Sequence, residues 1–153
     1  MIKIRVIGVG NLLLGDEGIG IHAIEALAGQ KLPPEVELVD AGTAGLGLLN
    51  FLEDVEKVIF IDAADMSLPP GAIRRFQPED VRDSFQYREM SLHETGLLNI
   101  LALAQRTGQY PAEVVIYGIQ PQRLETSLEL SPVCRDALRE LTAKVLEELG
   151  RPR

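Results

Sequence analysis

The sequence contains a single cysteine, Cys134, among 153 residues. One thiol excludes an intramolecular disulfide and any zinc site that is built on paired cysteines. The G-x-S-x-G elbow of many serine hydrolases is also missing, which disfavours a Ser-His-Asp mechanism. Cys134 lies on the apolar stripe of a predicted helix, so we interpret it as a core residue rather than as a nucleophile.

Positive charge and long apolar runs are scarce as well. The formal net charge is −8, and such a field opposes approach to nucleic acid or to an anionic membrane surface. No uninterrupted apolar run is long enough to cross a bilayer, and the first residues lack the apolar core of a signal peptide. We therefore expect a cytoplasmic monomer that binds neither nucleic acid nor membrane.

The remaining composition is typical of one soluble globular domain. Apolar residues make up 46% of the chain and charged residues 25%. A chain of this length can bury roughly two-thirds of its unfolded surface in a single core. No internal repeat, low-complexity tract or linker divides it, so we expect a single domain over residues 1–153.

A glycine-rich turn near the start joins a predicted strand to a predicted helix. Such turns usually bind phosphate, but the dinucleotide fingerprint would need glycine where Leu13 stands. The P-loop spacing is met, yet Asp16 and Glu17 follow in place of Lys and Ser or Thr. Two carboxylates repel phosphate, so we interpret the turn as facing a cation, most simply a metal ion. Alternatively, its glycines serve only close packing and positive φ angles.

Strands and helices alternate along the rest of the chain. The predicted strands are Ile2–Val9, Val36–Asp40, Lys57–Asp62, the charged edge strand Ala72–Phe76, and Glu113–Gly118. Helices are predicted up to Ala28, from a Thr43 cap through Val55, from the Ser91-x-x-Glu94 capping box to Thr107, and from Ser131-Pro132 to Gly150. This order predicts an α/β three-layer sandwich, with an open, mainly parallel, twisted sheet of about five strands and helices on both faces.

Acidic residues follow three successive strands at the point where each strand ends. Glu17 follows the first strand, Asp40 ends the second, and Asp62 ends the third, with Asp65 close behind. The carboxyl ends of parallel strands gather at one edge of a sheet, where ligands bind. We therefore expect these carboxylates to converge.

A histidine completes a possible metal site. His93 would lie in the first turn of the capped helix, where the positive end of the helix dipole favours the neutral imidazole that a metal needs. Glu17, Asp62 and His93 would leave coordination positions open for water or a substrate atom. Zinc, nickel, manganese and iron all remain possible. The other histidine, His22, lies off the apolar stripe of its helix and is interpreted as solvated.

Simpler explanations exist for each of these residues. Asp40 and Asp65 can be turn formers. For Asp16 we favour capping of the following helix over metal ligation, because adjacent residues seldom both face one ion. Glu17 can be a first-turn glutamate that the helix dipole stabilises, and His93 can be a solvated first-turn residue.

Five short motifs distributed over the chain suggest a family. They are Gly8-Val9-Gly10-Asn11 with Asp16-Glu17-Gly18-Ile19-Gly20, Asp40-Ala41-Gly42-Thr43-Ala44-Gly45, Ile61-Asp62-Ala63, Ser91-Leu92-His93, and Tyr117-Gly118-Ile119-Gln120-Pro121. Together they resemble the hydrogenase maturation endopeptidases, which remove a C-terminal extension from the precursor of the nickel–iron hydrogenase large subunit. The final helix is similar to the closing segment of that family.

The resemblance implies an α/β sandwich and an endopeptidase of nickel-dependent or aspartic type. It implies Glu17, Asp62 and His93 as metal ligands and catalytic residues. It further implies nickel that the substrate, the large-subunit precursor, already carries, although zinc or cadmium could occupy the site in a crystal.

Asp40, Gly42 and Thr43 are expected substrate-binding residues of the same crevice. The alternative from another class is a non-catalytic maturation chaperone that holds nickel or a peptide there. A nucleotide-dependent enzyme that uses the glycine turn is disfavoured by the acid pair.

Overall fold

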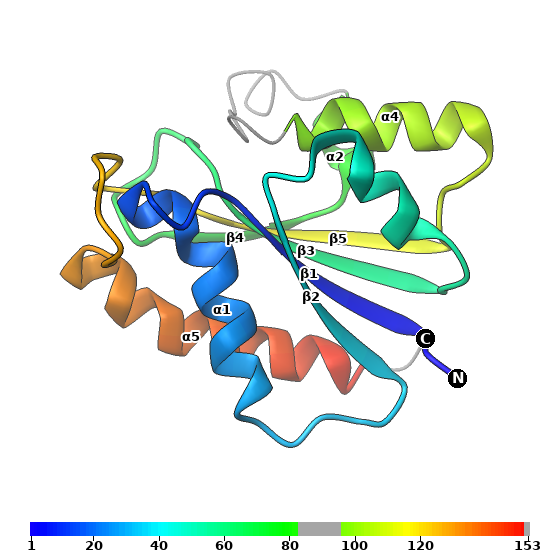
Figure 1. Ribbon diagram of the computed structural model, residues 1–153, viewed down its shortest axis with the longest axis horizontal. Helices are drawn as coiled ribbons and strands as arrows, with labels where there is room; N and C mark the ends of the chain where they lie inside the picture. The colour runs from blue at the N-terminus through cyan, green and yellow to red at the C-terminus, as the bar shows by residue number, and fades with distance from the viewer. Residues whose placement is uncertain (83–95, 152–153) are drawn as a thin grey trace.

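The computed structural model describes residues 1–82 and 96–151 and contains a five-stranded sheet (Figure 1). In sequence order the strands are β1 (Ile4–Val9), β2 (Val36–Gly42), β3 (Lys57–Ala63), β4 (Ile73–Phe76) and β5 (Glu113–Ile119). The spatial order is β2-β1-β3-β5-β4. All neighbours pair in parallel except β4, which is an antiparallel edge strand beside β5. The predicted strands, including the edge strand, are confirmed.

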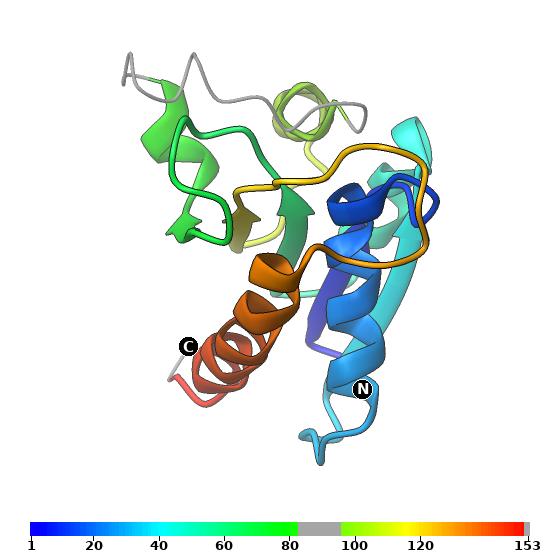
Figure 2. The same cartoon turned by 90° about the vertical axis from the view of Figure 1, so that its left-hand side faces the viewer.

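Helices cover both faces of this sheet. They are the 3-10 helices η1 (Gly15–Gly18) and η2 (Gly45–Leu52) and the α-helices α1 (Ile19–Ala28), α2 (Pro78–Arg82), α4 (Leu97–Thr107) and α5 (Pro132–Leu149). Helices α1 and α5 lie on one face, and η2 and α4 lie on the other (Figures 1 and 2). The predicted three-layer α/β sandwich is therefore confirmed. Within the described ranges, no helix combines the length and apolar character that a bilayer crossing requires.

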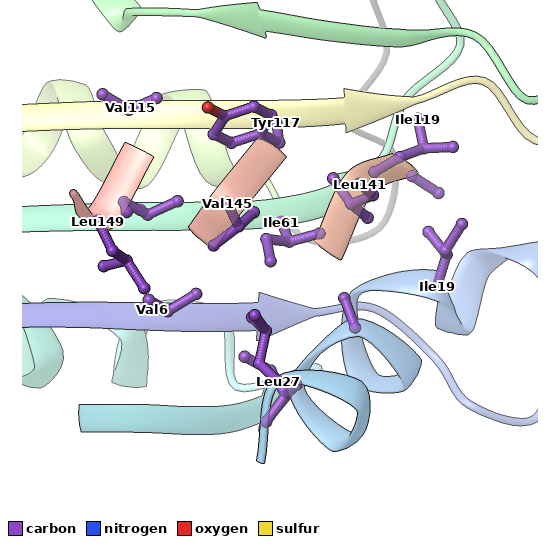
Figure 3. Packing of buried hydrophobic residues seen from close by; sticks show 14 of the residues in the cluster. Val6, Ile19, Leu27, Ile61, Val115, Tyr117, Ile119, Leu141, Val145 and Leu149 are labelled. Atoms are coloured by element: carbon purple, nitrogen blue, oxygen red, sulfur yellow. The ribbon is translucent and has the colours of Figure 1, made fainter. Parts of the chain in front are cut away.

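The central strand β3 separates two hydrophobic cores. Every residue of β3 is buried. Ile59 and Ile61 pack with residues of α1 and α5, as Figure 3 shows for Ile61, whereas Val58 and Phe60 pack with residues of η2 and α4. Successive side chains of a strand point to opposite faces, so the middle of a strand covered on both sides favours apolar residues at every position. This is the physical reason for the uninterrupted apolar run in the sequence.

The glycine turn brings α1 close to the sheet. A Cβ atom on Gly20 would lie 2.9 Å from the backbone nitrogen of Val9, a distance that real Cβ atoms do not tolerate. The glycine therefore lets the start of α1 rest directly on the end of β1. The close-packing explanation of the glycine turn is confirmed at this position.

Two predicted helix starts are wrong. Thr43 does not cap η2, whose N-cap is Ala44 without a side-chain hydrogen bond, and η2 ends before Val55. Its glycines favour a tight 3-10 helix over a regular α-helix. Helix α4 begins at Leu97, after Gly96 in the left-handed conformation, rather than at Ser91. The Ser91 capping box itself lies outside the described residues.

Candidate active site

Glu17 and Asp62 lie at the carboxyl edge of the sheet, where β1 and β3 end. Glu17 belongs to η1 and is 6% exposed, and Asp62 belongs to β3 and is 1% exposed. Gly10 lies against both residues. A Cβ atom placed on it would overlap the carbonyl oxygen of Glu17 and lie 3.9 Å from Asp62 Oδ1. Gly10 has φ 137°, a conformation that strongly favours glycine, so its lack of a side chain lets the backbone of Glu17 lie against it, close to the Asp62 carboxylate.

Asp16 performs a different task from its neighbour Glu17. Its buried carboxylate accepts hydrogen bonds from four donors in a segment more than 100 residues away. The donors are the backbone nitrogens of Gln122 (2.9 Å), Arg123 (2.7 Å) and Ser131 (2.8 Å) and the Ser131 hydroxyl (2.8 Å). Asp16 therefore neither faces a cation nor caps the following helix, which has no side-chain cap, and both of these expectations are wrong.

These donors also shift the acidity of Asp16. Burial acts to raise its pKa, but the backbone N–H groups of Arg123, Ser131 and Gln122 outweigh burial, so that the pKa is lowered. The carboxylate is thus held in its charged form, which is the better acceptor.

Residues 121–130, which we name the edge loop, run alongside the glycine turn (Figure 2). Backbone hydrogen bonds join Gly15 N to Ser127 O (2.8 Å), Asp16 N to Arg123 O (2.7 Å) and Ser127 N to Leu13 O (2.9 Å). Ser131, which follows the edge loop, is also the predicted cap of α5, since its side chain accepts a hydrogen bond from Cys134 N. The edge loop is thereby fixed to the turn that carries Glu17.

Asp40, Gly42 and Thr43 form a turn on the other side of Gly10. Asp40 Oδ1 accepts a hydrogen bond from Gly42 N at 3.1 Å, and Gly42 adopts φ 51°. Asp40 is therefore a turn former, as its simpler explanation states. Gly42 O in turn accepts from Gly10 N at 2.9 Å, so this turn lies at the same edge as Glu17 and Asp62. Asp40 and Thr43 are exposed there.

Gln120 belongs to one of the family motifs, but its residue type alone predicted no role for it. Its side chain is buried after β5, where its Oε1 accepts hydrogen bonds from Met66 N (2.6 Å) and Leu68 N (3.3 Å). Its Nε2 donates to Asp65 Oδ1 at 3.3 Å, and Asp65 also accepts from Ser67 N as a turn former. The available signal was a polar residue directly after a buried strand, at the edge where the acids gather.

The predictions for the two histidines have different outcomes. His93 lies outside the described residues, and the first-turn argument does not hold for α4, because that helix begins at Leu97. Within residues 1–82 and 96–151, no three acidic, histidine or cysteine side chains form a metal-binding group. His22 is half-buried, and its Nε2 atom is buried and has no hydrogen-bond partner among the described residues, so the expectation that it is solvated is wrong.

Comparison with known proteins identifies the family to which this chain belongs. A profile of the hydrogenase maturation protease family matches residues 21–148. The chain belongs to this family. The hydrogenase expression/formation protein HoxM of Cupriavidus necator is 44% identical over 119 residues, which cover 77% of this chain and 59% of that relative. This chain therefore spans less than two thirds of the length of several curated relatives.

Other members of the family match over nearly the whole chain. The hydrogenase 2 maturation protease of Escherichia coli is 34% identical over 149 residues, which cover 96% of this chain and 90% of that relative. A solved structure of the hydrogenase maturating endopeptidase HybD from E. coli aligns with a TM-score of 0.82 at 32% identity and covers 97% of this chain and 92% of that chain. The family resemblance that the motifs indicated is confirmed.

Proposed function

We propose that this protein is an endopeptidase that removes the C-terminal extension from the nickel-loaded precursor of a nickel–iron hydrogenase large subunit. Membership of the hydrogenase maturation protease family supports the peptidase activity. The printed names of its relatives, a hydrogenase 2 maturation protease and a hydrogenase maturating endopeptidase, support a hydrogenase precursor as the substrate.

The observation that carries the proposal is the burial of two acids, Glu17 and Asp62, at the carboxyl edge of the sheet. Glu17 and Asp62 bring two carboxylates to the edge of the sheet where ligands of such folds bind. Buried carboxylates at one edge of a sheet create a negative potential, and a divalent cation bound there lowers it. Carboxylate oxygens are suitable donors for a divalent metal, and nickel is also well suited to an imidazole. The donor chemistry of this edge therefore fits a metal-bearing substrate, with His93 as the proposed third ligand.

The acid pair has two tasks in this proposal. By holding the metal centre of the precursor, Glu17 and Asp62 position the scissile peptide bond against the sheet edge, and positioning of this kind accelerates a reaction by removing orientational freedom. Hydrolysis also needs a base that takes a proton from the attacking water. The two carboxylates are the candidate bases, and the bound ion supplies electrophilic assistance.

The decisive test is incubation of the purified protein with nickel-loaded and with nickel-free precursor, followed by mass spectrometry. We expect a loss of mass that corresponds to the C-terminal extension, and only for the nickel-loaded precursor. Asp62→Asn and His93→Ala should abolish cleavage while melting temperatures stay close to that of the wild type. Asp54→Asn is the matched control. Asp54 is exposed at the opposite edge with φ 60°, a conformation that asparagine tolerates.

The same assay separates the enzyme from a chaperone. A chaperone would bind the nickel-loaded precursor without changing its mass. Full cleavage by both site variants would exclude the proposed site but not the activity, whereas tight binding without cleavage by the wild type would exclude the activity.

A further inference from the structure

Exposed leucines are concentrated at the edge of the sheet that carries Glu17 and Asp62. Six large apolar residues are exposed in the described part of the chain, and four of them lie on the glycine turn, the start of η2 and the edge loop, which follow β1, β2 and β5. They are Leu13 (60% exposed), Leu46 (67%), Leu124 (45%) and Leu128 (62%), and we name them the apolar rim. Single exposed leucines need no explanation, but concentration on one edge indicates an interaction surface.

Hydrogen bonds hold together the two segments that carry Leu13 and Leu128. Leu13 and Leu128 belong to segments that are joined by the Ser127 N to Leu13 O hydrogen bond and by a bridge between Leu14 and Ser127. The Asp16 carboxylate fastens the base of the same loop. A surface that is held in place before binding loses little conformational entropy when a partner arrives.

The charge around the apolar rim is strongly one-sided. The segments 10–18, 40–46, 64–71 and 120–131 carry six acidic residues and one basic residue, Arg123. The positive charge of Arg123 is itself paired, because its Nε atom lies 3.5 Å from Glu125 Oε1. Asp40, Asp65 and Glu129 are exposed beside the leucines. A partner that fits this edge must present apolar side chains bordered by lysines and arginines.

We propose that the apolar rim is the docking surface for the protein substrate, and that it binds an apolar patch bordered by basic residues on the folded precursor. This inference rests on the proposed function, which names that precursor. Glu17 and Asp62 are buried at the edge of the sheet that carries the apolar rim, with Leu46 after the Asp40 turn and the other three leucines on the glycine turn and edge loop. A protein whose metal centre reaches Glu17 and Asp62 must cover the leucines as it approaches.

Binding and cleavage assays together test the docking surface. Binding to immobilised nickel-loaded precursor is measured in the Asp62→Asn background, which prevents turnover. Because this background also lacks one of the carboxylates proposed to hold the metal, each rim variant is compared with Asp62→Asn alone. Adding Leu13→Ser and Leu128→Ser should weaken that binding about tenfold. In the otherwise wild-type protein, the same two changes should raise KM by a similar factor and leave kcat unchanged. Binding should also weaken as salt concentration rises, because the charge contribution is screened.

The matched control is Leu103→Ser. Leu103 is exposed on α4, away from this edge, and its substitution should change neither binding nor KM. Equal binding by the rim variant and the control would overturn the docking surface while leaving the proposed protease intact. A wild type that binds but does not cleave would overturn the protease, and the binding series would still decide the docking surface.

Two further outcomes would also overturn the inference. If the wild type does not bind the precursor at all, the apolar rim is not its docking surface. If the wild type elutes as a dimer in size-exclusion chromatography and the Leu13→Ser/Leu128→Ser variant elutes as a monomer, the surface joins two copies of this chain instead.

Discussion

The two ends of the sheet each bury a carboxylate, and they stabilise it by different means. Near the amino ends of β3 and β5, the carboxylate of Glu148 is surrounded by cations and a phenol. Its partners are Lys57 Nζ (2.7 Å), Arg75 Nε (2.5 Å), Arg151 Nη1 (3.2 Å) and the Tyr117 hydroxyl (2.8 Å). Near the carboxyl ends, Asp16 is held by N–H and O–H donors of uncharged groups.

The difference separates fold stability from the geometry of the site. Cations around Glu148 balance its charge where helix α5 closes over the sheet, and such a buried cluster is costly to break. Neutral donors around Asp16 are directional, so they fix the position of the edge loop relative to η1. The acid beside the candidate active site thus sets the geometry of the site, whereas the distant acid contributes mainly to folding.

Glu148→Ala should have the largest effect. It leaves Lys57 buried without its closest partner and Arg75 without its ion pair, so we expect a loss of about 3–5 kcal/mol in the free energy of unfolding. Denaturant unfolding measures this loss. Glu140→Ala on the exposed side of α5 is the control and should change stability by less than about 0.5 kcal/mol. Similar small effects of both changes would contradict the importance of the Glu148 cluster.

The pH dependence of unfolding should report on the same cluster. Burial alone would raise the pKa of Glu148, but the hydrogen bonds from Arg75, Lys57 and Tyr117 lower it to about 2. A lowered pKa in the folded state stabilises the fold above the unfolded pKa of about 4.5, and this contribution disappears as the pH falls toward about 2.

At neutral pH the contribution is on the order of 3 kcal/mol. Stability measured between pH 6 and pH 2 should therefore fall more steeply for the wild type than for Glu148→Gln. Parallel curves would show that other carboxylates cause the acid sensitivity.

Asp16→Asn should have a smaller effect on stability, of about 2 kcal/mol, because the amide replaces one acceptor oxygen by a donor that faces other donors. Ser131→Ala removes one of the four hydrogen bonds and the cap of α5, and should cost about 1 kcal/mol. Differential scanning calorimetry can rank the two variants. An Asp16→Asn protein as stable as the wild type would show that the edge loop is held by its backbone hydrogen bonds alone.

The alkylation rate of Cys134 can distinguish the effect of Asp16 from the effect of Glu148, and this difference should be the smallest of those predicted. Burial raises the pKa of its thiol to about 11, and the side chain has no exposed surface, so native alkylation should be slow. Because Cys134 N bonds to the same Ser131 that donates to Asp16, Asp16→Asn should accelerate labelling more than Glu148→Gln does. The two variants should be compared at denaturant concentrations that give equal global stability. Equal labelling rates would mean that both acids act only through global unfolding.

Local patterns in the chain were sufficient for much of the architecture. The apolar run in β3 predicted a strand covered on both faces, and Ser131-Pro132 with Gly150 predicted both ends of α5. These signals depend on nearest neighbours and on hydrophobic periodicity, which a sequence contains directly. They failed where glycines altered the local backbone, at η2 and at Gly96 before α4.

The sequence by itself determined the fold class, the family motifs and the edge at which acidic residues end the strands. Only the tertiary structure decided that Asp16 holds the edge loop, that Glu17 and Asp62 are both buried at the carboxyl edge of the sheet, and that four leucines are exposed on segments at this edge. The physical reason is that a carboxylate can be satisfied by a cation, a metal or backbone N–H groups. Which of these it meets depends on segments more than 100 residues away in the chain.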